Sequence, residues 1–89
     1  AYQAARSAAL RLVGELADKA DLDKVKIIRI TGYVNAVEGF SEQPAVINGA
    51  SDLIVEVFGE NGRHARSAIG VGSLPENASV EVEMIAQML

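Results

Sequence analysis

The chain has 89 residues and no cysteine, so neither disulfide bonds nor thiolate metal sites can stabilise it. Its formal net charge of −4 opposes non-specific binding to nucleic acid, because such binding depends on Lys and Arg side chains that neutralise phosphates. With one histidine, His64, and no apolar run of roughly 18 residues, neither a nitrogen-rich metal site nor a membrane span is expected. A chain this short buries only about 60–65% of its unfolded surface, which leaves oligomerisation as the means of stabilising its core.

Residues 2 to about 19 have the spacing of an amphipathic helix. Small and apolar side chains recur at steps of three and four along it: Ala5, Ala8, Ala9, Leu12, Val13 and Leu16. The many alanines favour helix and permit close packing. A polar turn from Asp21 to Asp23 ends this segment.

Residues 24 to 37 predict a strand, because β-branched and aromatic side chains dominate them. The apolar run Ile27-Ile28 followed by Ile30 favours a central strand over an edge strand. A loop follows at Gly39, and Ser41 is a candidate N-cap for a second helix.

That second helix is predicted from about residue 44 to 58, with Gly59 as the residue that ends it. Its apolar stripe consists of Val46, Ile47, Ala50, Leu53, Ile54, Val57 and Phe58. Two further strands are expected from about residues 65 to 71 and 79 to 86. The predicted order is therefore α-β-α-β-β in one domain, an α+β fold in which two helices cover one face of the sheet.

The last two strands carry the residues most suggestive of chemistry. Arg66 stands among Ala65, Ser67 and Ala68, whose small side chains leave room for an anion beside the guanidinium. Alternation predicts that Ser67, Ile69 and Val71 face the helices. Arg66 would then share the uncovered face with Glu81 and Glu83.

Simpler interpretations of the same residues stay open. Arg66 could form a structural ion pair with Glu81 or Glu83, and charges on a sheet face are usually only solvated. His64 could act as an acid-base group or be an ordinary surface residue. Asn48, in the second helix, could touch a ligand or simply be exposed.

The segments Ala65-Arg66-Ser67, Leu74-Pro75 and Val80 to Ala86, together with Asn48, resemble the reactive-intermediate deaminase (Rid, YjgF-like) family. Its members are also called endoribonuclease L-PSP. The resemblance implies a chorismate-mutase-like α+β fold with a mixed sheet. It also implies a homotrimer with sheets inward, helices outward and ligand clefts between adjacent subunits.

The resemblance further implies hydrolysis of a small enamine or imine, such as 2-aminoacrylate or 2-iminopropionate, to a keto acid and ammonia. Arg66 would bind the substrate carboxylate, Glu81 would handle the attacking water or the proton, and Asn48 would lie near the cleft. Ala68 stands where many active members have a cysteine. This difference favours an alternative, in which the protein is a non-catalytic trimer that binds small carboxylates or has a regulatory role.

The resemblance covers the whole chain, which we interpret as one domain, residues 1–89, without the family's N-terminal strands. Because the chain lacks an initiator Met and opens directly into a helical pattern, we expect that upstream sequence was removed or belongs to a separate piece. We expect a cytoplasmic protein that needs no metal or organic cofactor. Ribonuclease activity, which the second family name suggests, fits poorly with an acidic chain that has no basic cluster.

Overall fold

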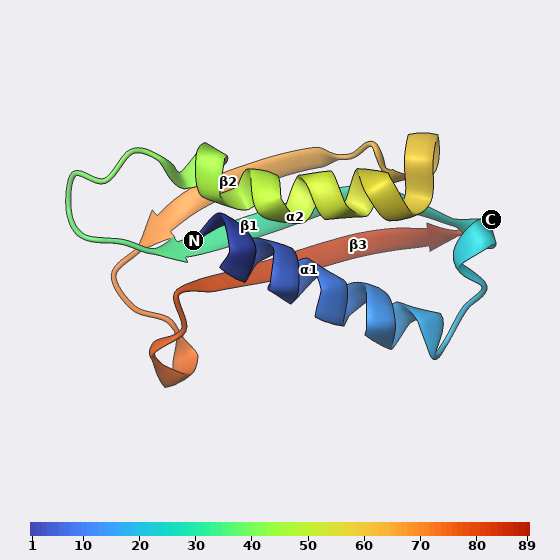
Figure 1. Ribbon diagram of the computed structural model, residues 1–89, viewed down its shortest axis with the longest axis horizontal. Coiled ribbons are helices and arrows are strands. Elements are labelled where there is room, and N and C mark those ends of the chain that lie inside the picture. Colours follow the sequence, from blue (N-terminus) through green and yellow to red (C-terminus); the bar gives the residue numbers. More distant parts are fainter.

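A computed structural model describes all residues from 1 to 89, in the predicted order of elements. The helices and strands are α1 (Tyr2–Ala17), β1 (Val25–Asn35), α2 (Gln43–Phe58), β2 (Ala65–Val71) and β3 (Val80–Met88). Three short 3-10 turns connect them: η1 (Leu22–Lys24), η2 (Gly59–Gly62) and η3 (Pro75–Asn77). Figure 1 shows both helices on the same side of the three strands, which confirms the α+β prediction.

The sheet is mixed, with strand order β2-β1-β3. Strand β1 is central, as its apolar run predicted, and it pairs in parallel with β2 and antiparallel with β3. A parallel pair needs a long crossover connection, which α2 provides. The register places Arg66 beside Ile30 on one side of β1, and Glu81 beside Tyr33 on the other.

The core lies between the helices and the sheet. Its largest fully buried side chains are Val25, Ile27, Ile30, Ile47 and Ile54. The predicted stripe of α1 is confirmed, since all its members are buried or packed against the core. The stripe of α2 is confirmed except at Val57, which is 41% exposed.

Helix α2 is held against α1 by a close backbone approach and by polar contacts. A Cβ atom on Gly49 would lie 2.0 Å from the carbonyl oxygen of Tyr2, so only glycine fits there. Arg6 forms an ion pair of 2.6 Å with Glu56, and the Tyr2 hydroxyl donates to Asp52 at 2.6 Å. These contacts fix the helix that carries part of the candidate site.

The ends of the elements differ slightly from the prediction. Helix α2 begins at Gln43, with Glu42 rather than Ser41 at the N-cap position and no side-chain cap. It ends, as predicted, at Gly59, whose φ of +62° suits a residue without a Cβ atom. The strand predicted over residues 24–37 spans 25–35, and the last strand extends to Met88. Neither helix combines the length and the hydropathy that a membrane crossing requires.

The predicted orientation of β2 was wrong. Ala68 packs against the core, and a Cβ atom on Gly70 would lie 2.7 Å from Nε2 of Gln43 in α2. Ser67 instead accepts a hydrogen bond from Arg29, and Ile69 is 44% exposed. The small residues Ala68 and Gly70 therefore lie on the helix side of β2, and the larger Ile69 lies on the uncovered side.

The orientation of β3 was predicted correctly: Val82 is buried and Glu81 and Glu83 are exposed. The arginine and the two glutamates therefore do not share the uncovered face. Arg66 lies on the helix side of the sheet, in line with Ala68 and with Ile30 of the neighbouring strand.

Candidate functional site

Arg66 lies near the start of β2, at the edge of the sheet next to helix α2. Its Nη1 atom lies 3.2 Å from the Ser51 hydroxyl oxygen, and its Nη2 atom lies 3.4 Å from the Pro44 carbonyl oxygen. The two ion pairs of the chain, Arg6–Glu56 and Arg63–Glu60, do not include it. A guanidinium has five N–H donors, so Arg66 keeps donors for a ligand. The structural ion pair with Glu81 or Glu83 is not formed.

Ser51 links Arg66 to His64. The Nε2 atom of His64 lies 3.0 Å from the Ser51 hydroxyl oxygen, and its Nδ1 atom lies 2.5 Å from the Gly62 carbonyl oxygen. A carbonyl only accepts hydrogen bonds, so this partner assigns the imidazole proton to Nδ1. Nε2 is then the acceptor, and the Ser51 hydroxyl donates to it.

The short turn after α2 fixes the position of this histidine. Gly62 is buried, and a Cβ atom there would lie 2.6 Å from the Ile54 carbonyl oxygen of α2. The turn is therefore packed directly on the helix. His64 follows two residues later and is half-buried against Ser51.

These side chains surround an open cavity of about 310 Å³ between α2 and the start of β2. It is lined by Asn48, Ser51, Val55, Arg63, His64 and Arg66. The lining includes two arginines and the only histidine, and it contains no carboxylate, although the chain as a whole is acidic. Arg63 is largely exposed and pairs with Glu60 at 3.2 Å. The cavity therefore suits a small anion that Arg66 binds through paired N–H groups.

The structure brings two of the predicted site residues, Arg66 and Asn48, into this one cavity. Ala68 lies on the same face of β2 but packs against the core and does not line the cavity. Glu81 is exposed on the opposite face of the sheet. A single chain therefore does not bring Glu81 to Arg66.

Glu83 has a structural partner on that opposite face, since it accepts a hydrogen bond from the Tyr33 hydroxyl. This hydrogen bond raises the pKa of Tyr33, and partial desolvation and the nearby carboxylates of Glu83 and Glu81 raise it further. Tyr33 and Glu83 thus form one polar pair on the uncovered side.

Sequence reasoning missed Ser51. Its signal was its spacing from Asn48: residues three apart on a helix share a face. A second signal was that His64 and Arg66 are two positions apart, because in extended chain this spacing places both side chains on the same face of the sheet.

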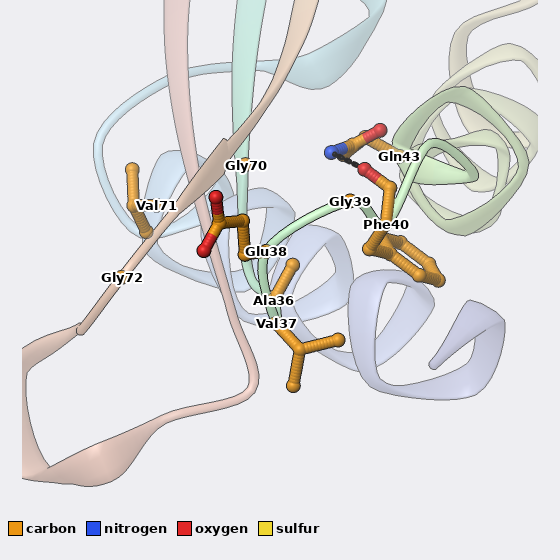
Figure 2. A pocket seen from close by; sticks show the side chains of 9 residues that line it. All are labelled: Ala36, Val37, Glu38, Gly39, Phe40, Gln43, Gly70, Val71 and Gly72. Atoms are coloured by element: carbon orange, nitrogen blue, oxygen red, sulfur yellow. Dashed lines mark hydrogen bonds between the residues drawn. The ribbon is translucent and has the colours of Figure 1, made fainter.

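A second cavity, of about 350 Å³, lies where β1 and β2 end (Figure 2). The loop from Ala36 to Phe40 forms one wall, and Gln43 and residues 70–72 form the other. Figure 2 shows the Gln43 amide turned toward the Phe40 carbonyl, to which it donates at 2.9 Å. Glu38 is the one ionisable side chain that lines this second cavity, so the cavity has no cationic group that could bind an anion. The cavity beside Arg66 is the stronger candidate.

Comparisons with known proteins agree with this fold. The family model described as Endoribonuclease L-PSP matches residues 1–88. Protein TCP17 of Trypanosoma cruzi is 49% identical over 88 residues, which cover 96% of this chain and 55% of that protein.

Two crystal structures are similar over nearly the whole chain. The protein Atu1372 of Agrobacterium tumefaciens, of unknown function, matches with a TM-score of 0.92 and 46% identity, over 98% of this chain and 57% of that one. A candidate endoribonuclease of Shewanella oneidensis matches with a TM-score of 0.89 and 33% identity, over 99% and 59%. The chain thus spans somewhat more than half the length of each of these relatives.

Proposed function

Since the chain belongs to the endoribonuclease L-PSP family, also called the Rid or YjgF-like family, we propose that it is a subunit of an enzyme that hydrolyses small enamines or imines. The products are a keto acid and ammonia. The observation that carries this proposal is the Arg66 guanidinium, which has no carboxylate partner and lies at a cavity without acidic side chains.

The substrate is a small imino acid such as 2-iminopropionate, which forms from 2-aminoacrylate. Arg66 binds the substrate carboxylate through two parallel hydrogen bonds, which fix the orientation of the substrate and contribute binding energy. Asn48, with both amide donors and an acceptor, lies at the same cavity and can contact the ligand. Ala68, further along the same face of β2, packs against the core and does not line this cavity, so within one chain it does not contact the ligand.

Hydrolysis requires a proton on the imine nitrogen and a water molecule directed at the imine carbon. Water adds to the C=N carbon, the nitrogen takes up protons, and the C–N bond breaks as the C=O bond forms. Because the substrate is already reactive, holding it by its carboxylate beside proton-transfer groups is enough for useful acceleration.

The assembly we propose is a cytoplasmic homotrimer with sheets inward and clefts between subunits. The uncovered face of the sheet supports this, because it exposes Ile69 by 44% and Ile85 by 60%, beside Tyr33 and the two glutamates. Exposed apolar residues on one face are typical of an interaction surface. Within this assembly, Glu81 acts on a substrate only across a subunit boundary, since it lies on the other face from Arg66 of its own chain.

The alternative is a trimer that binds small carboxylates without turnover. Ala68, at the position where many active relatives have a cysteine, favours it. Both functions use Arg66, so one assay separates them: ammonia release from freshly generated 2-aminoacrylate by the full-length protein, its Arg66→Ala variant and an Arg11→Ala control. Arg11 is exposed on α1, remote from the cavity.

Turnover that is lost only in Arg66→Ala supports the enzyme. Absence of turnover in all three proteins, with binding of 2-oxobutyrate that depends on Arg66, supports the binding protein. A ribonuclease would instead release acid-soluble fragments from labelled RNA. The acidic balance of the chain argues against that activity.

A further inference from the structure

We infer that Ser51 and His64 are catalytic residues that carry the protons of this reaction; the inference rests on the proposed imine hydrolysis. The two side chains form a relay beside Arg66, in which Ser51 meets the reacting atoms and His64 stores the proton. The relay gives the site an acid and a base within one chain, on the face of the sheet that Glu81 does not reach.

The first support is the composition of the cavity. Of the six side chains that line it, only His64 is of a type that takes up and releases protons near neutral pH. The others are an amide, a hydroxyl, a valine and two arginines, none of which takes up or releases a proton without a partner base at that pH.

The second support is the orientation of the imidazole. The Gly62 carbonyl holds the Nδ1 proton and leaves the Nε2 lone pair directed at the Ser51 hydroxyl, 3.0 Å away. A base that is oriented by a third group and bonded to a hydroxyl is the arrangement by which proteins activate serine oxygens. The close packing of Gly62 on the Ile54 carbonyl keeps this third group in place.

The third support is the position of Ser51 between Arg66, which binds the carboxylate, and His64, which takes up the proton. Its oxygen accepts from Arg66 Nη1 at 3.2 Å while its hydrogen points to His64. A carboxylate on Arg66 therefore lies next to the Ser51 hydroxyl, with its adjacent imine carbon within the same cavity. The positively charged guanidinium also favours a serine oxygen that is losing its proton.

The steps balance without any further reactant. As water attacks the carbon of the protonated imine, one water proton passes to the Ser51 oxygen while the Ser51 proton passes to His64 Nε2, and the C=N electron pair moves to nitrogen. The relay then runs in reverse and protonates the amine. The C–N bond breaks, the hydroxyl O–H pair forms the C=O bond, and its proton leaves with ammonia as ammonium.

The same hydrogen bonds could serve only to join α2 to β2, so the test must separate proton transfer from structure. We would measure kcat for ammonia release and the Kd of 2-oxobutyrate for the full-length protein and for Ser51→Ala, His64→Gln and Arg66→Ala. The glutamine in His64→Gln can still accept from Ser51 but cannot take up a proton. Nitrogen-15 NMR of the unmodified protein reports independently which ring nitrogen of His64 carries the proton.

The relay predicts that Ser51→Ala and His64→Gln each lower kcat by about 10²- to 10⁴-fold and leave the Kd of 2-oxobutyrate unchanged. Arg66→Ala raises that Kd instead. The NMR spectrum shows the proton on Nδ1, and ligand binding shifts the Nε2 resonance.

Two results would overturn the relay and leave the enzyme standing: unchanged kcat in both relay variants, or a proton on Nε2 in the unmodified protein. Loss of ligand binding in both variants would also overturn it, because the pair would then be structural. Absence of turnover in the unmodified protein contradicts the proposed function itself, and the relay with it.

Discussion

Arg66 and Glu81 lie on opposite faces of the sheet, with strand β1 between the strands that carry them. Arg66 contacts helix α2, whereas Glu81 stands beside Tyr33 on the side without helices. The residue that we propose binds the anion and the carboxylate that the family resemblance assigns to proton transfer are thus separated within one chain.

This separation predicts that the two residues contribute independently to stability. In a double-mutant cycle with Arg66→Ala and Glu81→Ala, we expect a coupling free energy below about 0.5 kcal/mol, because residues without shared partners are additive. Urea unfolding of the four proteins measures it. A coupling of 1 kcal/mol or more, roughly what contacting groups show, would mean that the two charges interact.

The approach of Gly49 to Tyr2 predicts that α2 tolerates no side chain at that point. A Cβ atom 2.0 Å from the Tyr2 carbonyl oxygen forces the two helices apart, so Gly49→Ala should destabilise the fold by about 1–3 kcal/mol or more. Gly14→Ala in α1 is the matched control, because nothing lies within 4 Å of its Cβ position. That control should be neutral or stabilising by up to about 1 kcal/mol. Equal effects in the two variants would contradict the close packing.

The Tyr33–Glu83 pair predicts a defined pH dependence. The pKa of Tyr33 is raised above the ordinary 10.0, first by its hydrogen bond to Glu83. A raised folded-state pKa means that the pair stabilises the fold below pH 10 and that this contribution is lost as pH rises through the folded value.

Tyrosinate absorbance, followed in a Tyr2→Phe background, measures the Tyr33 titration directly. Glu83→Ala removes both the acceptor and the charge, so it should return the Tyr33 pKa toward its ordinary value. Glu83→Gln keeps an acceptor and should lower the pKa less. A titration that is unaffected by either substitution would contradict the pairing.

The uncovered sheet face predicts where subunits meet. A lysine in place of Ile85, which is 60% exposed there, should dissociate the assembly, because charges are depleted at the centre of interfaces. Val57→Lys on α2, at a residue that is 41% exposed, is the matched control and should leave it intact. Light scattering on size-exclusion fractions measures the mass. If the helix-face variant dissociates and the sheet-face variant does not, the helices form the contact instead.

The helices and the central strand could be predicted because their signals are local. The apolar spacing of α1 and α2 and the β-branched run of β1 fix their type, and Gly59 marks the end of α2. The N-cap at Ser41 was wrong because the helix starts at Gln43, which puts Glu42 at the N-cap position without a side-chain cap.

The orientation of β2 could not be predicted because alternation identifies two faces but not which one the helices cover. Ile69 is larger and more apolar than Ala68, so the usual rule places it in the core. Here the small residue Ala68 packs against the core, and Gly70 on the same face lies beside the Gln43 side chain of α2. The apolar side chain of Ile69 is left exposed on the face of the sheet without helices.

Only part of the site could be identified from the sequence, because the rest depends on how the elements pack together. Arg66 and Asn48 were identified, but Ser51 and His64 acquire meaning only when the parallel register sets the start of β2 beside α2. That contact joins residues 13 positions apart. Helical spacing relates Ser51 to Asn48, and strand alternation relates His64 to Arg66, but neither pattern predicts the contact between Ser51 and His64.

The most direct measurement is calorimetric binding of 2-oxobutyrate to the full-length protein, to Arg66→Ala and to the Arg11→Ala control. Charge-assisted hydrogen bonds are worth about 1.5–3 kcal/mol, so Arg66→Ala should weaken binding by about 10- to 100-fold, whereas Arg11→Ala should bind normally. Equal affinity of all three proteins for the ligand would contradict a carboxylate site at Arg66.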